Sequence, residues 1–85
     1  MGGRGNFSGG TSRTTANKLP TEGNPNSKIK QYRNGKLHRE RYFDSDGRAK
    51  WDIDYSHGGN HKFPHKHTWD WSDPKNPKRS KYHED

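Results

Sequence analysis

The stretch IKQYRNGKLHRERYFDSDGRAKWDIDY, residues 29–55, decides the fold. It places two turn signals between strand-like segments, the last of which alternates apolar and polar residues. The dipeptide Asn34-Gly35 is the strongest short-range signal for a two-residue β-hairpin. The segment DSDG at 44–47 ends in a glycine, which suits the left-handed position of a three-residue hairpin loop. The sequence therefore predicts three consecutive antiparallel strands, at 29–33, 36–43 and 48–55.

The second turn also predicts which residues face each other. With a three-residue loop we expect the following pairs: Phe43 with Ala49, Arg41 with Trp51, Arg39 with Ile53, and Leu37 with Tyr55. This register buries Trp51 and Ile53 on one face of the sheet and sets the Arg41 guanidinium against the Trp51 ring. It leaves Asp52 and Asp54 on the opposite face, which we expect to be solvated and charged.

Residues 65–71 alternate in the same way and predict a fourth short strand, with His65 and His67 on one face. No stretch of the chain shows a convincing helical period. We therefore expect a mostly β fold, a small antiparallel β-meander of three to four strands over residues 28–72.

Both ends differ in composition from this module. Residues 1–27 are rich in Gly, Ser, Thr and Asn, and they have too few apolar side chains to offset the entropy cost of ordering, so they predict a disordered arm. Residues 73–85 combine two prolines with several basic residues and predict a flexible basic tail.

The composition limits both the core and the classes of function. Only 20% of the 85 residues are hydrophobic, whereas 12% are aromatic, so a few large rings must form most of any core. The chain has no cysteine, which excludes disulfides and thiolate metal sites. It has neither an apolar run of about 20 residues nor a signal-peptide pattern, so we expect no membrane partner.

The charge balance points to a polyanionic partner. The chain has 17 Lys and Arg against 10 Asp and Glu, a formal net charge of +7. Phosphate neutralisation makes nucleic acid the commonest partner of such a protein, and the alternative is a charge that only keeps the protein soluble. The candidate nucleic-acid-binding residues are Arg39, Arg41, Lys62, Lys66, Lys78 and Arg79.

Four histidines gather at His57, His61, His65 and His67. As metal ligands they would suit Zn or Ni, and this is the only cofactor that the sequence suggests. As catalytic groups they could act as general acid and base on a phosphodiester without any cofactor, with Asp52 or Asp54 orienting an imidazole. As a third alternative, they are polar surface residues of a basic protein. The sequence leaves these alternatives open.

Three stretches together resemble a known module: RYFDSDGR at 41–48, WDIDYSHGG at 51–59 and HKFPHKH at 61–67. They look like a small module at the C-terminal ends of phage minor capsid or head-morphogenesis proteins and in related tails of bacterial polymorphic toxins. The first stretch also resembles a tyrosine–aspartate repeat of the Rhs type. The likeness covers residues 28–72.

The resemblance implies a phage or prophage origin, and with it a location in the bacterial cytoplasm or in a virion. In the toxin setting it implies a nuclease built on the four histidines with Asp52 and Asp54. In the virion setting it implies a binding or structural role with a virion or toxin-related protein partner. We therefore expect a small basic module that binds nucleic acid, with a histidine-based nuclease activity as its extension. The alternatives are a histidine-rich metal-binding structural module and a virion protein-interaction module without catalysis.

Overall fold

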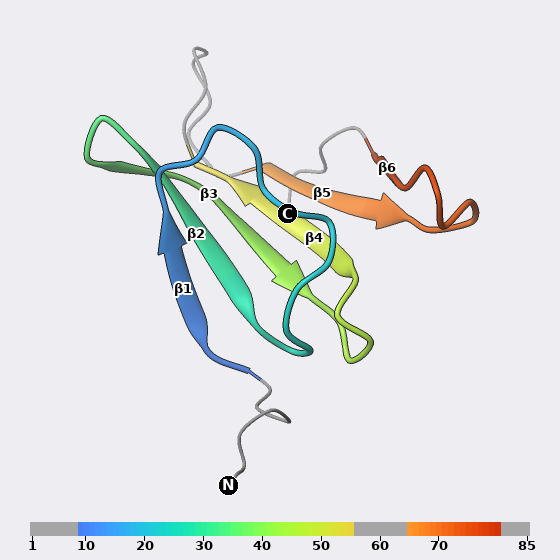
Figure 1. The fold of residues 1–85 in the computed structure, drawn as a ribbon. Helices are drawn as coiled ribbons and strands as arrows, with labels where there is room; N and C mark the ends of the chain where they lie inside the picture. Colours follow the sequence, from blue (N-terminus) through green and yellow to red (C-terminus); the bar gives the residue numbers. More distant parts are fainter. Residues whose placement is uncertain (1–8, 56–64, 81–85) are drawn as a thin grey trace, which may run out of the picture.

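The computed structural model describes residues 9–55 and 65–80. They form six strands: β1 Thr11–Thr14, β2 Lys28–Arg33, β3 Lys36–Phe43, β4 Ala49–Asp54, β5 His65–Asp70 and β6 Lys78–Arg79. The strands lie in chain order across one sheet (Figure 1), and only β1 and β2 pair in parallel. The mostly β prediction is confirmed, with more strands than the three to four expected. The described residues contain no helix able to span a membrane.

Both predicted turns are confirmed. Asn34 and Gly35 have φ angles of 52° and 79°, the left-handed pair that a tight hairpin between β2 and β3 needs. At the β3–β4 turn Gly47 has a φ of 81°, and the Asp44 carboxylate accepts hydrogen bonds from the backbone N–H groups of Asp46 and Arg48. Local turn chemistry therefore sets the two hairpins.

The predicted register between β3 and β4 is wrong beyond its first pair. Phe43 does face Ala49, but the register shifts between Tyr42 and Phe43, where Lys50 is the extra residue of a bulge on β4. Every later pair therefore moves by one residue. The observed pairs are Tyr42 with Trp51, Arg41 with Asp52, Glu40 with Ile53, and Arg39 with Asp54.

Because side chains alternate along a strand, this one-residue shift moves the β4 side chains after Lys50 to the face opposite the expected one. Asp52 has no exposed surface and Asp54 only 9%, although we expected both on a solvated face. Trp51 and Ile53 lie on the opposite face and are half-buried.

The connection from β1 to β2, residues 15–27, covers the face that holds the two aspartates. It crosses in front of β3 and β4 in Figure 1. The side-chain N–H of Gln31 donates to the Ala16 carbonyl at 2.8 Å, and the Ala49 N–H donates to the Thr21 carbonyl at 2.8 Å. We call residues 15–27 the crossover segment and this side of the sheet the covered face.

Over residues 9–27 the structure thus differs from the disordered arm that we expected for residues 1–27. Residues 9–27 contribute β1 and the crossover segment. Composition could not reveal this, since backbone N–H and carbonyl groups of the segment make many of its contacts with the sheet.

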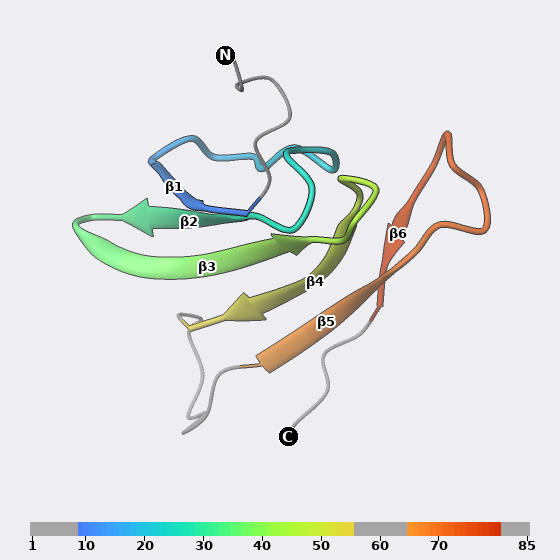
Figure 2. The same ribbon diagram turned by 90° about the horizontal axis from the view of Figure 1, so that it is seen from below.

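The interior is more polar than apolar. Among the described residues, Phe43 and Ala49 are the buried hydrophobic ones, at 3% and 1% exposure. The buried polar and charged residues are Gln31, Glu40, Arg41, Asp52, Asp54 and His65. Figure 2 shows that β5 and β6 turn away from the plane of β1 and β2, so the sheet is strongly twisted.

Replacement of Gly47 by alanine should destabilise the fold strongly. A Cβ at this position would overlap the backbone carbonyl oxygen of Gly23, in addition to the strain of a φ of +81°. Gly35 is the matched control, because its φ is +79° but no atom lies within 4 Å of an added Cβ. We expect Gly35→Ala to lower the free energy of unfolding by about 1 kcal/mol, and Gly47→Ala by at least twice as much, in urea denaturation. Equal losses would show that the Gly23–Gly47 contact does not form.

Candidate functional site

The covered face is organised by an ion pair between Arg41 on β3 and Asp52 on β4. Arg41 Nε and Nη2 donate to the two carboxylate oxygens of Asp52 at 2.8 and 3.0 Å, and the two side chains are 6% and 0% exposed. Arg41 Nη1 donates to the carbonyls of Leu19 and Pro20 at 2.9 and 3.0 Å. The guanidinium therefore joins β3, β4 and the crossover segment, and it is not exposed to a polyanion.

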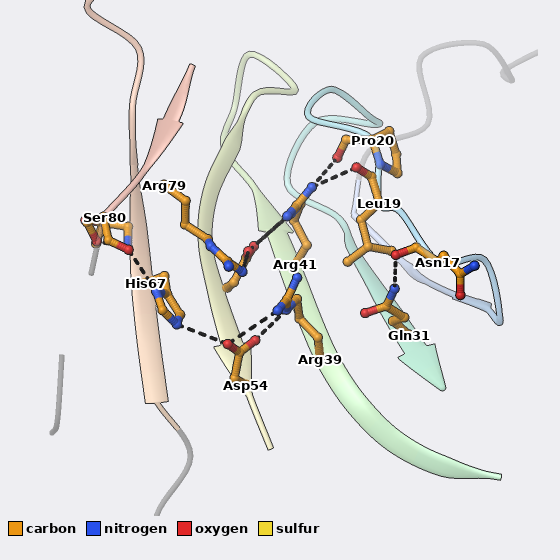
Figure 3. A network of polar contacts seen from close by, with 12 residues as sticks. Asn17, Leu19, Pro20, Gln31, Arg39, Arg41, Asp54, His67, Arg79 and Ser80 are labelled. Carbon is orange, nitrogen blue, oxygen red and sulfur yellow. Dashed lines mark hydrogen bonds and ion pairs between the residues drawn. The ribbon is translucent and has the colours of Figure 1, made fainter. Parts of the chain in front are cut away.

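A second network lies beside this pair (Figure 3). Arg39 Nε donates to Asp54 Oδ1, and His67 Nε2 lies 3.0 Å from Asp54 Oδ2. His67 Nδ1 lies 2.8 Å from the Ser80 carbonyl oxygen, which can only accept. Each ring nitrogen of His67 therefore lies against an oxygen atom, and in this arrangement both ring nitrogens make contacts within the fold.

The pKa of Asp54 reflects two opposed effects. Burial alone would raise the pKa of this carboxyl group, but the hydrogen bond and positive charge of Arg39, with the charges of His67 and Arg79, lower it below its ordinary value. Asp54 is therefore an ionised partner of Arg39 and His67 at neutral pH.

Arg79 and Trp69 complete the covered face. Arg79 Nη1, on β6, lies 3.4 Å from Asp52 Oδ2. The Arg41 guanidinium carbon lies 4.7 Å from the centroid of the Trp69 ring, so the expected stacking of Arg41 on Trp51 is wrong. Trp69 lies opposite Arg79 in the β5–β6 pair.

The structure brings together six of the predicted site residues. Five of their side chains meet on the covered face: Asp52, Asp54, His67, Arg39 and Arg79. Arg41 joins them, whereas His65 is a buried residue opposite Asp54 in the β4–β5 pair. Lys66 faces the other side of the sheet, and Lys78 is exposed on β6.

Three predicted site residues, His57, His61 and Lys62, lie outside the described residues. Within 9–55 and 65–80, no three His, Asp or Glu side chains are grouped so that they could hold a metal ion. Two of the four proposed histidine ligands are not among these residues, so the Zn or Ni site stays a prediction.

The opposite, open face combines aromatic rings with lysines. The rings of Tyr42 and Trp51 lie 5.8 Å apart at a tilt of 54°. The ammonium groups of Lys66 and Lys50 lie 4.0 and 4.6 Å from the Trp51 ring centroid, and that of Lys28 lies 5.3 Å from the Tyr42 centroid. A groove of about 350 Å³ runs along part of this face. Sequence reasoning missed this surface because the expected register buried Trp51.

The Glu40 carboxylate holds several side chains of this open face in place. It is only 5% exposed, and its Oε1 accepts hydrogen bonds of 3.0 Å from the hydroxyl groups of both Tyr42 and Tyr55. Lys28 and Lys30 lie within 3.9 Å of its other oxygen. Burial first, and then the hydrogen bond and charge of Glu40, raise the pKa of Tyr55 to about 12 and also raise that of Tyr42. Both tyrosines are therefore neutral donors at physiological pH.

Removal of the Asp52 charge should cost more stability than removal of an exposed carboxylate. Asp52→Asn leaves the Arg41 guanidinium buried without its anion, and breaking a buried pair on one side typically costs about 3–5 kcal/mol. Urea denaturation should show a loss of this order for Asp52→Asn and less than about 0.5 kcal/mol for Asp46→Asn, at an exposed turn position. Similar losses for the two variants would contradict the described ion pair.

The lowered pKa of Asp54 predicts the sign of the acid response. Its contribution to stability is complete above the unfolded pKa of about 3.9 and is lost as the pH falls through the lower folded value. The melting temperature should therefore drop as the pH falls below about 4, and the drop should be shallower in Asp54→Asn. Asp46→Asn, at an exposed turn position, should keep the full drop. An unchanged acid response in Asp54→Asn would show that its carboxylate is not paired in the folded state.

Comparisons with known proteins return no matching family model, no matching curated protein and no matching solved structure. The resemblance to the phage capsid and toxin modules therefore stays a prediction, and the inferences about function depend on the geometry of the two faces.

Proposed function

We propose that the open face of the sheet binds single-stranded nucleic acid. The lysine–aromatic face, as we name it, consists of Lys28, Lys30, Tyr42, Lys50, Trp51 and Lys66. The single observation that carries the proposal is the Trp51 ring, which is half-buried on a sheet face with two lysine ammonium groups against it.

Each part of this surface matches a part of a nucleotide chain. An aromatic ring on a sheet face offers a stacking platform to an unpaired base, worth about 1–3 kcal/mol per base. The lysines around it can pair with the phosphates on either side of that base, because their long side chains can swing from the ring to a nearby anion. Two rings 5.8 Å apart can serve neighbouring bases of one strand.

The same features favour single strands over duplexes. Stacking on a side chain requires a base that is not already stacked in a helix. The described residues contain no helix that could enter a major groove, whereas an open sheet face suits an extended strand. The net charge of +7 adds an attraction that does not depend on sequence.

The proposal is binding and not cleavage. His67 is held between Asp54 and Ser80 with both nitrogens engaged, and it lies on the covered face, away from the lysine–aromatic face. Nuclease activity on the four histidines with Asp52 and Asp54 stays a prediction, because His57 and His61 lie outside the described residues.

Fluorescence titration with a short unstructured oligonucleotide tests the proposal. Binding should change the tryptophan emission and weaken steeply with salt. Trp51→Ala should lower the affinity by about tenfold, the equivalent of one lost stacking contact. Lys66→Gln should lower it uniformly across sequences and reduce the salt slope by about one unit.

Lys75→Gln is the matched control, because Lys75 is exposed in the turn between β5 and β6, away from the two rings. It should lose less affinity than Lys66→Gln. Affinity that is insensitive to Trp51→Ala in a folded variant, or equal losses for the two lysine variants, would contradict binding on this face.

A further inference from the structure

A pocket of about 320 Å³ opens on the covered face, between the crossover segment and the strands. Its charged and aromatic lining consists of Lys18, Arg39, Arg41, Arg79 and Trp69, which we name the arginine pocket. These residues come from the crossover segment, β3, β5 and β6. Figure 3 shows Arg39, Arg41 and Arg79 converging there.

The charges of this pocket are not balanced. Four cations line it, and the two carboxylates of Asp52 and Asp54 contact three of them. The fourth, Lys18, is exposed and makes no ion pair with the described residues. The pocket therefore keeps an excess of positive charge after its internal pairs are counted.

Its hydrogen-bond donors also exceed its acceptors. Arg41 gives its guanidinium to Asp52 and to two carbonyls, so it is nearly saturated. Arg39 uses Nε and Nη2 on Asp54, and its Nη1 meets no acceptor among the described residues. Within residues 9–55 and 65–80 the Arg79 guanidinium makes one polar contact, with Asp52 at 3.4 Å. The Trp69 Nε1 is buried and likewise has no acceptor in the described part of the chain.

We propose that the arginine pocket binds a phosphate group. Guanidinium groups present forked donors that match phosphate oxygens, and a tetrahedral anion can accept from several directions at once. The unused donors of Arg39 and Arg79 and the Lys18 ammonium group supply such a set. Asp52 and Asp54 hold the arginines in place from below, so the cations are positioned before the anion arrives.

This site is separate from the lysine–aromatic face, because the two lie on opposite sides of the sheet. The ligand chemistry has two sources, free phosphate and the terminal phosphate of a nucleic acid strand. The three indole N–H groups allow one NMR experiment to separate the pocket from the open face. Trp69 lines the pocket, Trp51 lies on the open face, and Trp71 donates its Nε1–H to the Ala49 carbonyl at 2.7 Å.

The test is a titration of the full chain with inorganic phosphate, with sodium chloride at equal ionic strength as reference. The Trp69 indole signal should shift saturably with phosphate, while the Trp71 signal stays in place. Arg79→Gln and Lys18→Gln should each lower the phosphate affinity, by about tenfold for Arg79. Arg13→Gln, an exposed change on β1, should leave it unchanged. The Lys18 variant keeps the test valid if Arg79→Gln impairs folding.

Three results would overturn the proposal: no saturable Trp69 shift, an equal shift with chloride, or equal affinity in the folded Lys18→Gln variant and the parent. Given saturable phosphate binding, a 5′-phosphorylated oligonucleotide that moves Trp69, when its unphosphorylated form does not, assigns the site to strand ends. If the same oligonucleotide shifts only the Trp51 signal, while inorganic phosphate shifts the Trp69 signal, the pocket is a site for free phosphate. The Trp51 signal reports nucleic-acid binding on the open face, and the Trp69 signal reports phosphate binding in the arginine pocket. Either proposal can therefore fail while the other holds.

Discussion

The buried ion pair between Arg41 and Asp52 is the interaction on which the described structure depends. It joins the two central strands, and the same guanidinium fixes the crossover segment through two backbone carbonyls. A chain with 20% hydrophobic residues has little else to bury, and here a charge pair takes the central place that an apolar cluster has in most small domains. A buried charge is tolerated only when it is paired and hydrogen-bonded, and Arg41 meets that requirement with four hydrogen bonds.

The ion pair also decides what the other face presents. Side chains alternate along β3 and β4, so burial of Arg41 and Asp52 turns their neighbours Tyr42 and Trp51 outward. On the covered face acids neutralise most of the arginines. On the open face Glu40 contacts Lys28 and Lys30, whereas Lys50 and Lys66 lie against the Trp51 ring and form no ion pair with the described residues. The division of charge between the faces follows from a single choice of register.

The sequence was sufficient for the local structure and insufficient for the register. Asn34-Gly35 and Gly47 predicted both hairpins, because each turn requires a particular backbone conformation. The bulge at Lys50 could not be predicted, since alternation in residues 49–55 fits either face until the pairing energies of Arg41 and Asp52 are counted.

The candidate site was predicted in part for the same reason. Asp52, Asp54 and His67 were chosen for their chemistry, and they do lie on one face, but as partners of arginines inside the fold. The crossover segment was beyond prediction because many of its contacts are made by backbone groups, which composition does not report. The lysine–aromatic face was missed because Trp51 was assigned to the core.

Cross-strand nuclear Overhauser effects between β3 and β4 test the central claim most directly. The register requires contacts between the backbones of Tyr42 and Trp51 and of Arg41 and Asp52, together with a contact between Arg41 and Leu19. Contacts that instead pair Arg41 with Trp51 would place the aspartates in solvent and Trp51 in the core. In that case neither the buried ion pair nor the lysine–aromatic face would exist.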